Sequence, residues 1–100
     1  MEVVLDRERL ERKGYDYDEF VVWLDQICLD EGMKRDTANT AALVYGGDDP
    51  YADYGNVMVA VSVLEEVPEF LENCKQWLWL QGKHGNDYQE DILSQVLAGR

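Results

Sequence analysis

The sequence predicts an all-α fold, a compact bundle of about four to five short helices in a single acidic domain spanning residues 1–100. Apolar residues recur at helical spacing in several stretches, and Pro, Gly and acidic residues stand where helices begin and end. The chain is also 46% hydrophobic, with three Trp, six Tyr and two Phe, which is enough to fold despite its high charge. An α+β fold, with a small sheet that includes residues 57–64, is the alternative.

The N-terminal third begins with a charge-balanced segment up to Lys13, in which Val3 and Val4 suit a short strand leading into a helical turn. The first clear helix starts near Tyr15–Asp18, where acids favour a helix N-terminus, and ends at Gly32, which tolerates positive φ. Its core-facing stripe comprises Phe20, Val21, Leu24, Ile27 and Cys28. Asp18, Val22, Asp25 and Leu29 share the opposite side, where the two apolar residues either touch a second element or form part of a contact face.

Two helices are predicted in the middle of the chain. Asp36 and Thr37 offer an N-cap for a short helix from Ala38 to Tyr45, closed by Gly46 and Gly47. Asp49 and Pro50 then start a central helix from Tyr51 to Glu66. Valines alternate with other residues over 57–63, which also suits a strand, but the Asp-Pro start and the restart at Pro68 favour the helix.

Two further helices complete the bundle. Pro68 and Gly82 frame the first, whose buried face comprises Phe70, Leu71, Cys74, Trp77 and Leu78. Trp79 points the other way and either covers a neighbouring helix or is an exposed anchor for a partner. The last helix runs from about Asp87, capped there or at Asn86, to Gly99. The expected core is Phe20, Leu24, Ile27, Val61, Leu64, Phe70, Cys74, Trp77, Ile92 and Val96.

Cysteine usage and the N-terminal residues bear on the compartment. Cys28 and Cys74 lie far apart, each within an apolar pattern, which indicates two buried free thiols in a reducing compartment. Met1 leads into charged residues with no apolar run that would form a signal or a membrane span. We therefore expect a cytoplasmic protein.

No catalytic, cofactor or metal motif accompanies these elements. His84 is the only histidine and stands in a Gly-rich turn, so a catalytic triad would depend on one loop residue. Tyr45 to Asp49 lacks the Gly-Lys-Ser/Thr spacing of a phosphate loop. Asp48, Asp49 and Asp53 could supply oxygen ligands to Ca²⁺ or Mg²⁺, but the spacing of a calcium loop is absent. We expect neither an enzyme nor a cofactor or metal protein.

Negative charge is the strongest functional signal. The formal net charge is −12, and the windows 14–33 and 36–74 contain acids but no Lys or Arg. Such a surface repels nucleic acid and attracts basic partners, as an acidic mimic of DNA does. A charge run that only solvates the surface is the simpler interpretation. The candidate partner-binding residues are Asp16, Asp18, Asp25, Asp30, Asp48, Asp49, Asp53 and Trp79.

The chain resembles the small acidic anti-CRISPR proteins encoded by phages, and among them the inhibitors of the type I-F surveillance complex. The resemblance rests on size, charge, the absence of an enzyme motif, and the segments Tyr15-Asp16-Tyr17-Asp18 and Trp77-Leu78-Trp79-Leu80. It implies a protein of the bacterial host cytoplasm that binds basic Cas surfaces and so prevents DNA binding. It transfers no functional residue and no fold. A small antitoxin or adaptor that neutralises another basic protein is the alternative.

Overall fold

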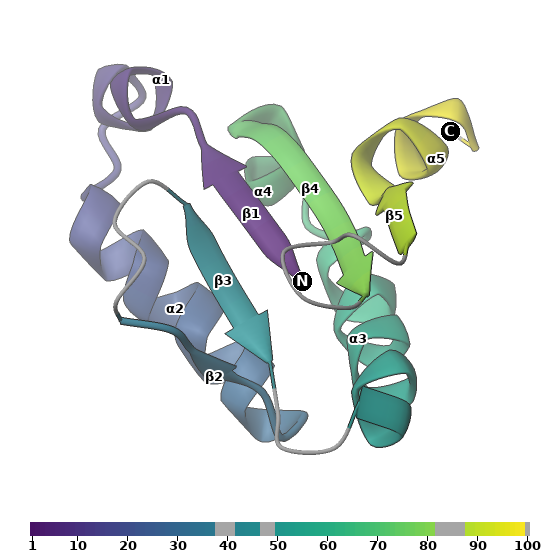
Figure 1. The fold of residues 1–100 in the computed structure, drawn as a ribbon. Coiled ribbons are helices and arrows are strands. Elements are labelled where there is room, and N and C mark those ends of the chain that lie inside the picture. Colours follow the sequence, from purple (N-terminus) through teal and green to yellow (C-terminus); the bar gives the residue numbers. More distant parts are fainter. Residues whose placement is uncertain (38–41, 47–49, 82–87, 100) are drawn as a thin grey trace.

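A computed structural model of the chain describes residues 1–37, 42–46, 50–81 and 88–99, with the backbone alone for 50–54, 80–81 and 88. In this part of the chain, helices and strands combine in an α+β fold (Figure 1). The elements are β1 (Glu2–Leu5), α1 (Arg7–Arg12), α2 (Tyr17–Asp30), β2 (Lys34–Arg35), β3 (Leu43–Gly46), α3 (Pro50–Leu64), α4 (Pro68–Glu72), β4 (Cys74–Gln81), β5 (Tyr88–Asp91) and α5 (Ile92–Ala98). The prediction of an all-α bundle is therefore wrong. The α+β alternative had the class right, but it placed residues 57–64 in the sheet, and they lie in α3.

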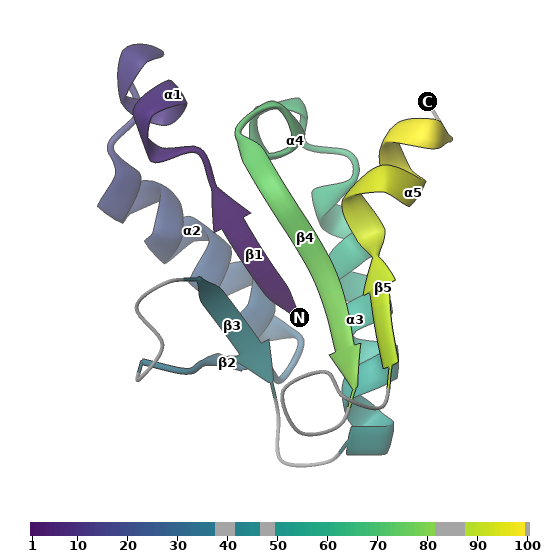
Figure 2. The ribbon, with the colours of Figure 1, turned by 45° about the horizontal axis from the view of Figure 1, so that its top comes forward.

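The strands form one antiparallel sheet in the order β2-β3-β1-β4-β5. β1 is central, and its Val3 pairs with Leu43 on one side and with Trp77 on the other. The register shifts between Val4 and Leu5, where β1 leaves the sheet towards α1. Both α2 and α3 lie on the same face of this sheet (Figures 1 and 2), so the main core forms between the sheet and these two helices.

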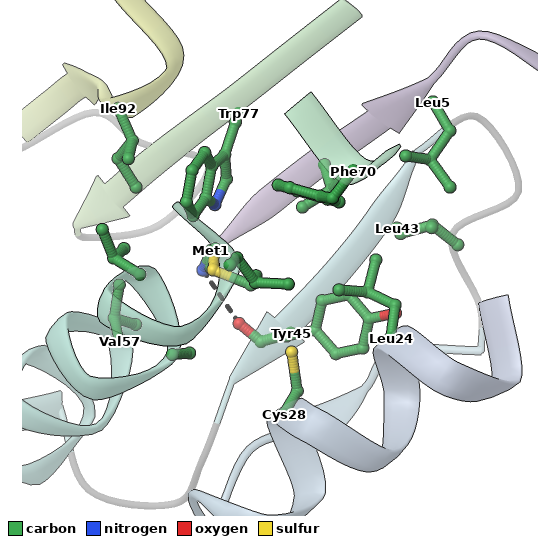
Figure 3. Close-up of a cluster of buried hydrophobic side chains, with 14 of the residues drawn as sticks. Met1, Leu5, Leu24, Cys28, Leu43, Tyr45, Val57, Phe70, Trp77 and Ile92 are labelled. Atoms are coloured by element: carbon green, nitrogen blue, oxygen red, sulfur yellow. Dashed lines mark hydrogen bonds between the residues drawn. The ribbon is translucent and has the colours of Figure 1, made fainter. Parts of the chain in front are cut away.

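The core joins side chains from both layers (Figure 3). Trp77 is fully buried and meets Phe70 of α4 edge to face, with ring centroids 5.1 Å apart. Seven residues of the expected core are buried: Phe20, Leu24, Val61, Leu64, Phe70, Trp77 and Ile92. The other three, Ile27, Cys74 and Val96, are partly buried against the same cluster. The predicted core is thus confirmed, although the elements that carry it differ.

The N-terminal elements and the central helix are confirmed. β1 and α1 are the expected strand and helical turn. α2 ends at Asp30, and Gly32, two residues further on, has the expected positive φ of +78°. Asp6 and Asp16 begin α1 and α2, since each side chain accepts a hydrogen bond from the backbone N–H three residues on. α3 starts at Pro50, as the Asp-Pro pair predicts. The strand alternative for 57–64 is wrong.

The predicted helix from Ala38 to Tyr45 is wrong for the part that the structure describes. Leu43–Gly46 is strand β3, which pairs with β1 on one edge and with β2 on the other. Leu43 and Tyr45 are buried while Val44 between them is half-buried, so side chains alternate between the two sheet faces. Residues 38–41 lie outside the described part.

The predicted helix from Pro68 to Gly82 is also wrong beyond Glu72. Asn73 ends α4: its side-chain Nδ2 donates to the Glu69 carbonyl oxygen at 2.6 Å. Its own carbonyl oxygen accepts from the Asp6 N–H at 2.7 Å, which fixes the start of β4 against the end of β1. The following residues then extend into β4, where Trp77 and Trp79 share the core face of the sheet.

The last helix begins later than expected. Tyr88–Asp91 forms strand β5, and α5 starts at Ile92. Asp91 is the N-cap, since its carboxylate accepts from the Ser94 N–H at 3.1 Å and from the Ser94 hydroxyl at 2.8 Å. The predicted caps, Asn86 and Asp87, lie outside the described residues.

Candidate protein-binding surface

Of the two candidate acids at the start of α2, one caps the helix and the other does not. Asp16 is exposed, but its Oδ1 accepts from the Glu19 N–H at 3.1 Å and so caps the helix. Asp18 is exposed and lies near Arg7, whose guanidinium stands 4.7 Å from the Tyr17 ring centroid. The hydrogen bond and charge of Glu11, with a smaller contribution from Asp18, raise the pKa of Arg7 above its usual value. Of the two candidates, only Asp18 is an acid without a capping role.

Asp25 is occupied within the protein. Its Oδ1 lies 3.1 Å from Arg35 Nε, and the same atom accepts a hydrogen bond from Tyr45 Oη at 2.6 Å. Burial, followed by this hydrogen bond and the negative charge of Asp25, holds the pKa of Tyr45 well above its usual range. Asp25 therefore ties α2 to β2 and β3, and its carboxylate is engaged in contacts within the protein.

Acids also stand at the C-terminal ends of helices, where they are unfavourable. α2 ends at Asp30, followed by Glu31, and has no basic residue in its last turn. α3 ends without a basic residue in its last turn as well, and Glu65 and Glu66 follow it. The partial negative charge of a helix C-terminus repels carboxylates by about 0.3–1 kcal/mol each. Asp30 Oδ1 accepts from Gln26 Nε2 at 2.8 Å and remains exposed.

The other three candidate acids lie close together in the sequence, at and before the start of α3. Asp48 and Asp49 lie outside the described residues, and Asp53 is placed on α3 by its backbone alone. Their role in binding stays a prediction.

Trp79 does not point away from the core. It is 7% exposed and belongs to the main buried cluster, because residues two apart on β4 share a face and Trp77 is its neighbour on that face. The prediction of an accessible Trp79 anchor depended on helical geometry for this segment and is wrong. The indole instead forms part of the wall of a surface groove.

That groove lies between α3 and α5 and has a volume of about 560 Å³. Val57 and Val61 line it from α3, and Ile92 and Val96 face them from α5. The charged side chains described on its lining are all acidic: Glu65, Glu66 and Glu90. The charge windows contain Glu65 and Glu66, but Glu90 lies on β5 and reaches the same groove only through the pairing of β5 with β4, so the sequence pattern did not reveal this site.

Large apolar side chains are exposed on both long helices. On α2, Val22 is 66% and Leu29 50% exposed, so the interpretation that they touch a second element of this protein is wrong. On α3, Met58, Val59 and Val63 are exposed, whereas Val57 and Leu64 are buried. A helix that is apolar on all sides is usually covered. The surface thus combines acids with uncovered apolar residues.

Two cysteine thiols lie among the described residues. Both cysteines are free, Cys28 is buried and Cys74 half-buried, and burial raises the pKa of each thiol to about 12, which keeps it protonated at neutral pH. Within the described residues, no group of three His, Cys, Asp or Glu side chains is arranged to hold a metal ion. His84 lies outside that part of the chain.

Comparisons with family models, curated proteins and solved structures find no match to this chain. In the described part, none of the helices has the length and apolar character needed to cross a membrane.

Proposed function

We propose that this protein binds and inhibits a basic nucleic-acid-binding protein by occupying its DNA-binding surface with an acidic face. The first partner to test is the type I-F CRISPR–Cas surveillance complex in the bacterial cytoplasm, to which the resemblance in size, charge and sequence points. The proposal involves no catalysis and no cofactor.

The observation that carries this proposal is a large excess of acidic over basic side chains, which continues at helix ends where acids are unfavourable. The chain has 21 acidic and 9 basic side chains, and among the described residues three ion pairs form: Arg7–Glu11, Lys13–Glu72 and Arg35–Asp25. Acids at helix C-termini and a large net charge both oppose folding. Residues that violate local stability rules are expected where function requires them.

The arrangement of α2 supports a contact surface. This helix has 14 residues, which gives a length of about 20 Å. Exposed Asp18 and Asp30 stand near its two ends, and exposed Val22 and Leu29 lie between them. Carboxylates can meet Lys and Arg of a DNA-binding surface, while the valine and leucine supply apolar contact that DNA phosphates lack.

The test is binding of the purified protein to the type I-F surveillance complex, with a cognate DNA duplex as competitor and a salt series. We expect DNA to compete and affinity to fall as salt rises. The triple variant Asp18→Asn, Asp30→Asn, Glu31→Gln should slow association. A matched variant, Glu2→Gln, Glu8→Gln, Glu69→Gln, removes the same charge from other elements and should have the smaller effect.

Two results would contradict the proposal. The wild-type protein could fail to bind the complex, or it could bind equally well with saturating DNA present. Binding to a different basic protein instead would favour the antitoxin or adaptor interpretation.

A further inference from the structure

We propose that the groove between α3 and α5 receives an apolar side chain flanked by Lys or Arg from a basic segment of the partner. This inference rests on the proposed function, since it names the part of the surface that would give a basic partner its specificity. The volume of the groove, its apolar lining and its acidic rim each favour this occupant.

The groove has room for a large apolar side chain together with the neighbouring residues of its segment. Its volume of about 560 Å³ falls in the usual range for ligand sites, about 300–1,000 Å³. Val57 and Val61 are one helical turn apart on α3, and Ile92 and Val96 are one turn apart on α5, so each helix contributes an apolar wall. Trp79 adds its ring to the lining. An aliphatic side chain placed there would lose contact with water on several sides.

The acidic rim of the groove determines which residues can flank the inserted side chain in the partner's segment. Glu66 is exposed, Glu65 and Glu90 are half-buried, and none of the lining residues that the structure describes is a Lys or an Arg. Cations next to the inserted side chain would therefore meet carboxylates, in surroundings partly shielded from water by the apolar walls, where such pairs are stronger than on an open surface.

Met58 extends the apolar surface beyond the groove. It lines the groove from α3 and is 45% exposed, beside the exposed Val59. Methionine adapts its shape to different ligands, as it does on other surfaces that bind amphipathic segments. A second copy of this chain is a poor occupant, because each copy has a net charge of −12 and would place acids against acids.

A synthetic peptide tests the groove separately from the natural partner. The probe is a fluorescein-labelled peptide of about 12 residues with one central Leu between Lys and Arg, and its control has Ser in place of that Leu. We expect the Leu peptide to bind about tenfold more tightly, because the groove removes part of the leucine side chain from water. Tenfold corresponds to about 1.4 kcal/mol of binding free energy. In a ¹⁵N–¹H spectrum, shifts should concentrate in residues 57–66 and 92–99 and at the Trp79 indole N–H.

Matched variants then locate the site. Gln95→Trp places a large ring at an exposed position on the groove and should weaken peptide binding about tenfold, whereas Leu97→Trp, on the same helix but not on the groove, should change it less than about twofold. Glu66→Lys should weaken binding about fivefold, and Glu31→Lys, the same charge change on α2, less than about twofold.

The results separate the two proposals. Equal binding of the Leu and Ser peptides, or shifts that lie outside the groove, would contradict the groove inference. Both measurements use the wild-type protein, so they hold even if every variant misfolds. So would a wild-type dimer that Gln95→Trp dissociates, because the occupant would then be a second copy. If the surveillance complex binds wild type and Gln95→Trp equally, the groove inference fails and the proposed function stands. If the Leu peptide binds in the groove but no basic nucleic-acid-binding protein does, the proposed function fails alone.

Discussion

Tyr45 on β3 donates a hydrogen bond to Asp25 on α2, and the 2.6 Å between Tyr45 Oη and Asp25 Oδ1 makes this a short contact with a charged acceptor. Because the tyrosine side chain is buried and the carboxylate also pairs with Arg35, this bond fixes the helix layer against the edge of the sheet. Tyr45→Phe should lower the free energy of unfolding by about 1.5–3 kcal/mol, measured by urea denaturation.

The control for this change is Tyr15→Phe, which removes the hydroxyl of an exposed tyrosine and should leave stability unchanged. An equal effect of the two substitutions would show that the Tyr45–Asp25 bond does not hold the layers together.

A second prediction concerns acids at helix ends. The substitutions Asp30→Asn and Glu31→Gln at the C-terminus of α2 should stabilise the protein, by about 0.3–1 kcal/mol per charge at low salt. The amide oxygen introduced by Asp30→Asn can still accept the hydrogen bond from Gln26. The matched pair Asp18→Asn and Glu19→Gln, in the first turn of the same helix, should destabilise it. Thermal melting at low and high salt measures the effect of each pair of substitutions. The dipole argument is contradicted if both pairs stabilise the protein or if neither does.

The contrast between α2 and β4 shows what the sequence could predict. Around α2, the apolar spacing, the capping acid Asp16 and the positive-φ Gly32 all indicate the same helix, and the structure confirms it. From Phe70 to Leu78 the same helical spacing fits, but the segment divides at Asn73. The hydrogen bond from the Asp6 N–H to the Asn73 carbonyl oxygen depends on tertiary structure and cannot be found from local spacing. The alternation of Trp and Leu over 77–80 was the available signal for a strand.

The candidate site was predictable only in part. Net charge and the exposure of Asp18 and Asp30 follow from composition and helical spacing. The engagement of Asp25 does not, because it requires Tyr45 and Arg35 to approach from two strands that the helical prediction lacked. The burial of Trp79 and the groove beside it likewise depend on the pairing of β4 with β1 and β5.

The burial of both tryptophans on β4 gives a third prediction. Trp77→Ala should cost about 3–5 kcal/mol of unfolding free energy, since it empties a fully buried aromatic site. Trp79→Ala should also destabilise the protein clearly, in contrast to what an exposed anchor would do. Denaturation of both variants checks this. An unchanged melting temperature for Trp79→Ala would contradict its place in the core.

The fourth prediction concerns the pH dependence of the thiols. Burial raises the pKa of Cys28 and of Cys74 to about 12, above the usual value for an unfolded chain of about 8.5. At pH 8 the native thiols should therefore be alkylated by iodoacetamide at least about 100-fold more slowly than in the urea-unfolded chain, because the thiolate reacts. Mass spectrometry of the two cysteine peptides over time measures each rate.

The same shift sets the direction of the stability change with pH. A group whose pKa is higher in the folded state contributes stability that is fully present below its unfolded pKa and is lost as pH rises through the folded one. For Cys28 this window runs from about pH 8.5 to pH 12. The free energy of unfolding of the wild-type protein should thus fall over this interval. It should fall less steeply in Cys28→Ala, where only the other titrating groups contribute. Rapid alkylation of native Cys28 at pH 8 would show that the thiol is accessible. An equally steep fall in the stability of Cys28→Ala at alkaline pH would show that burial of this thiol does not couple folding to pH.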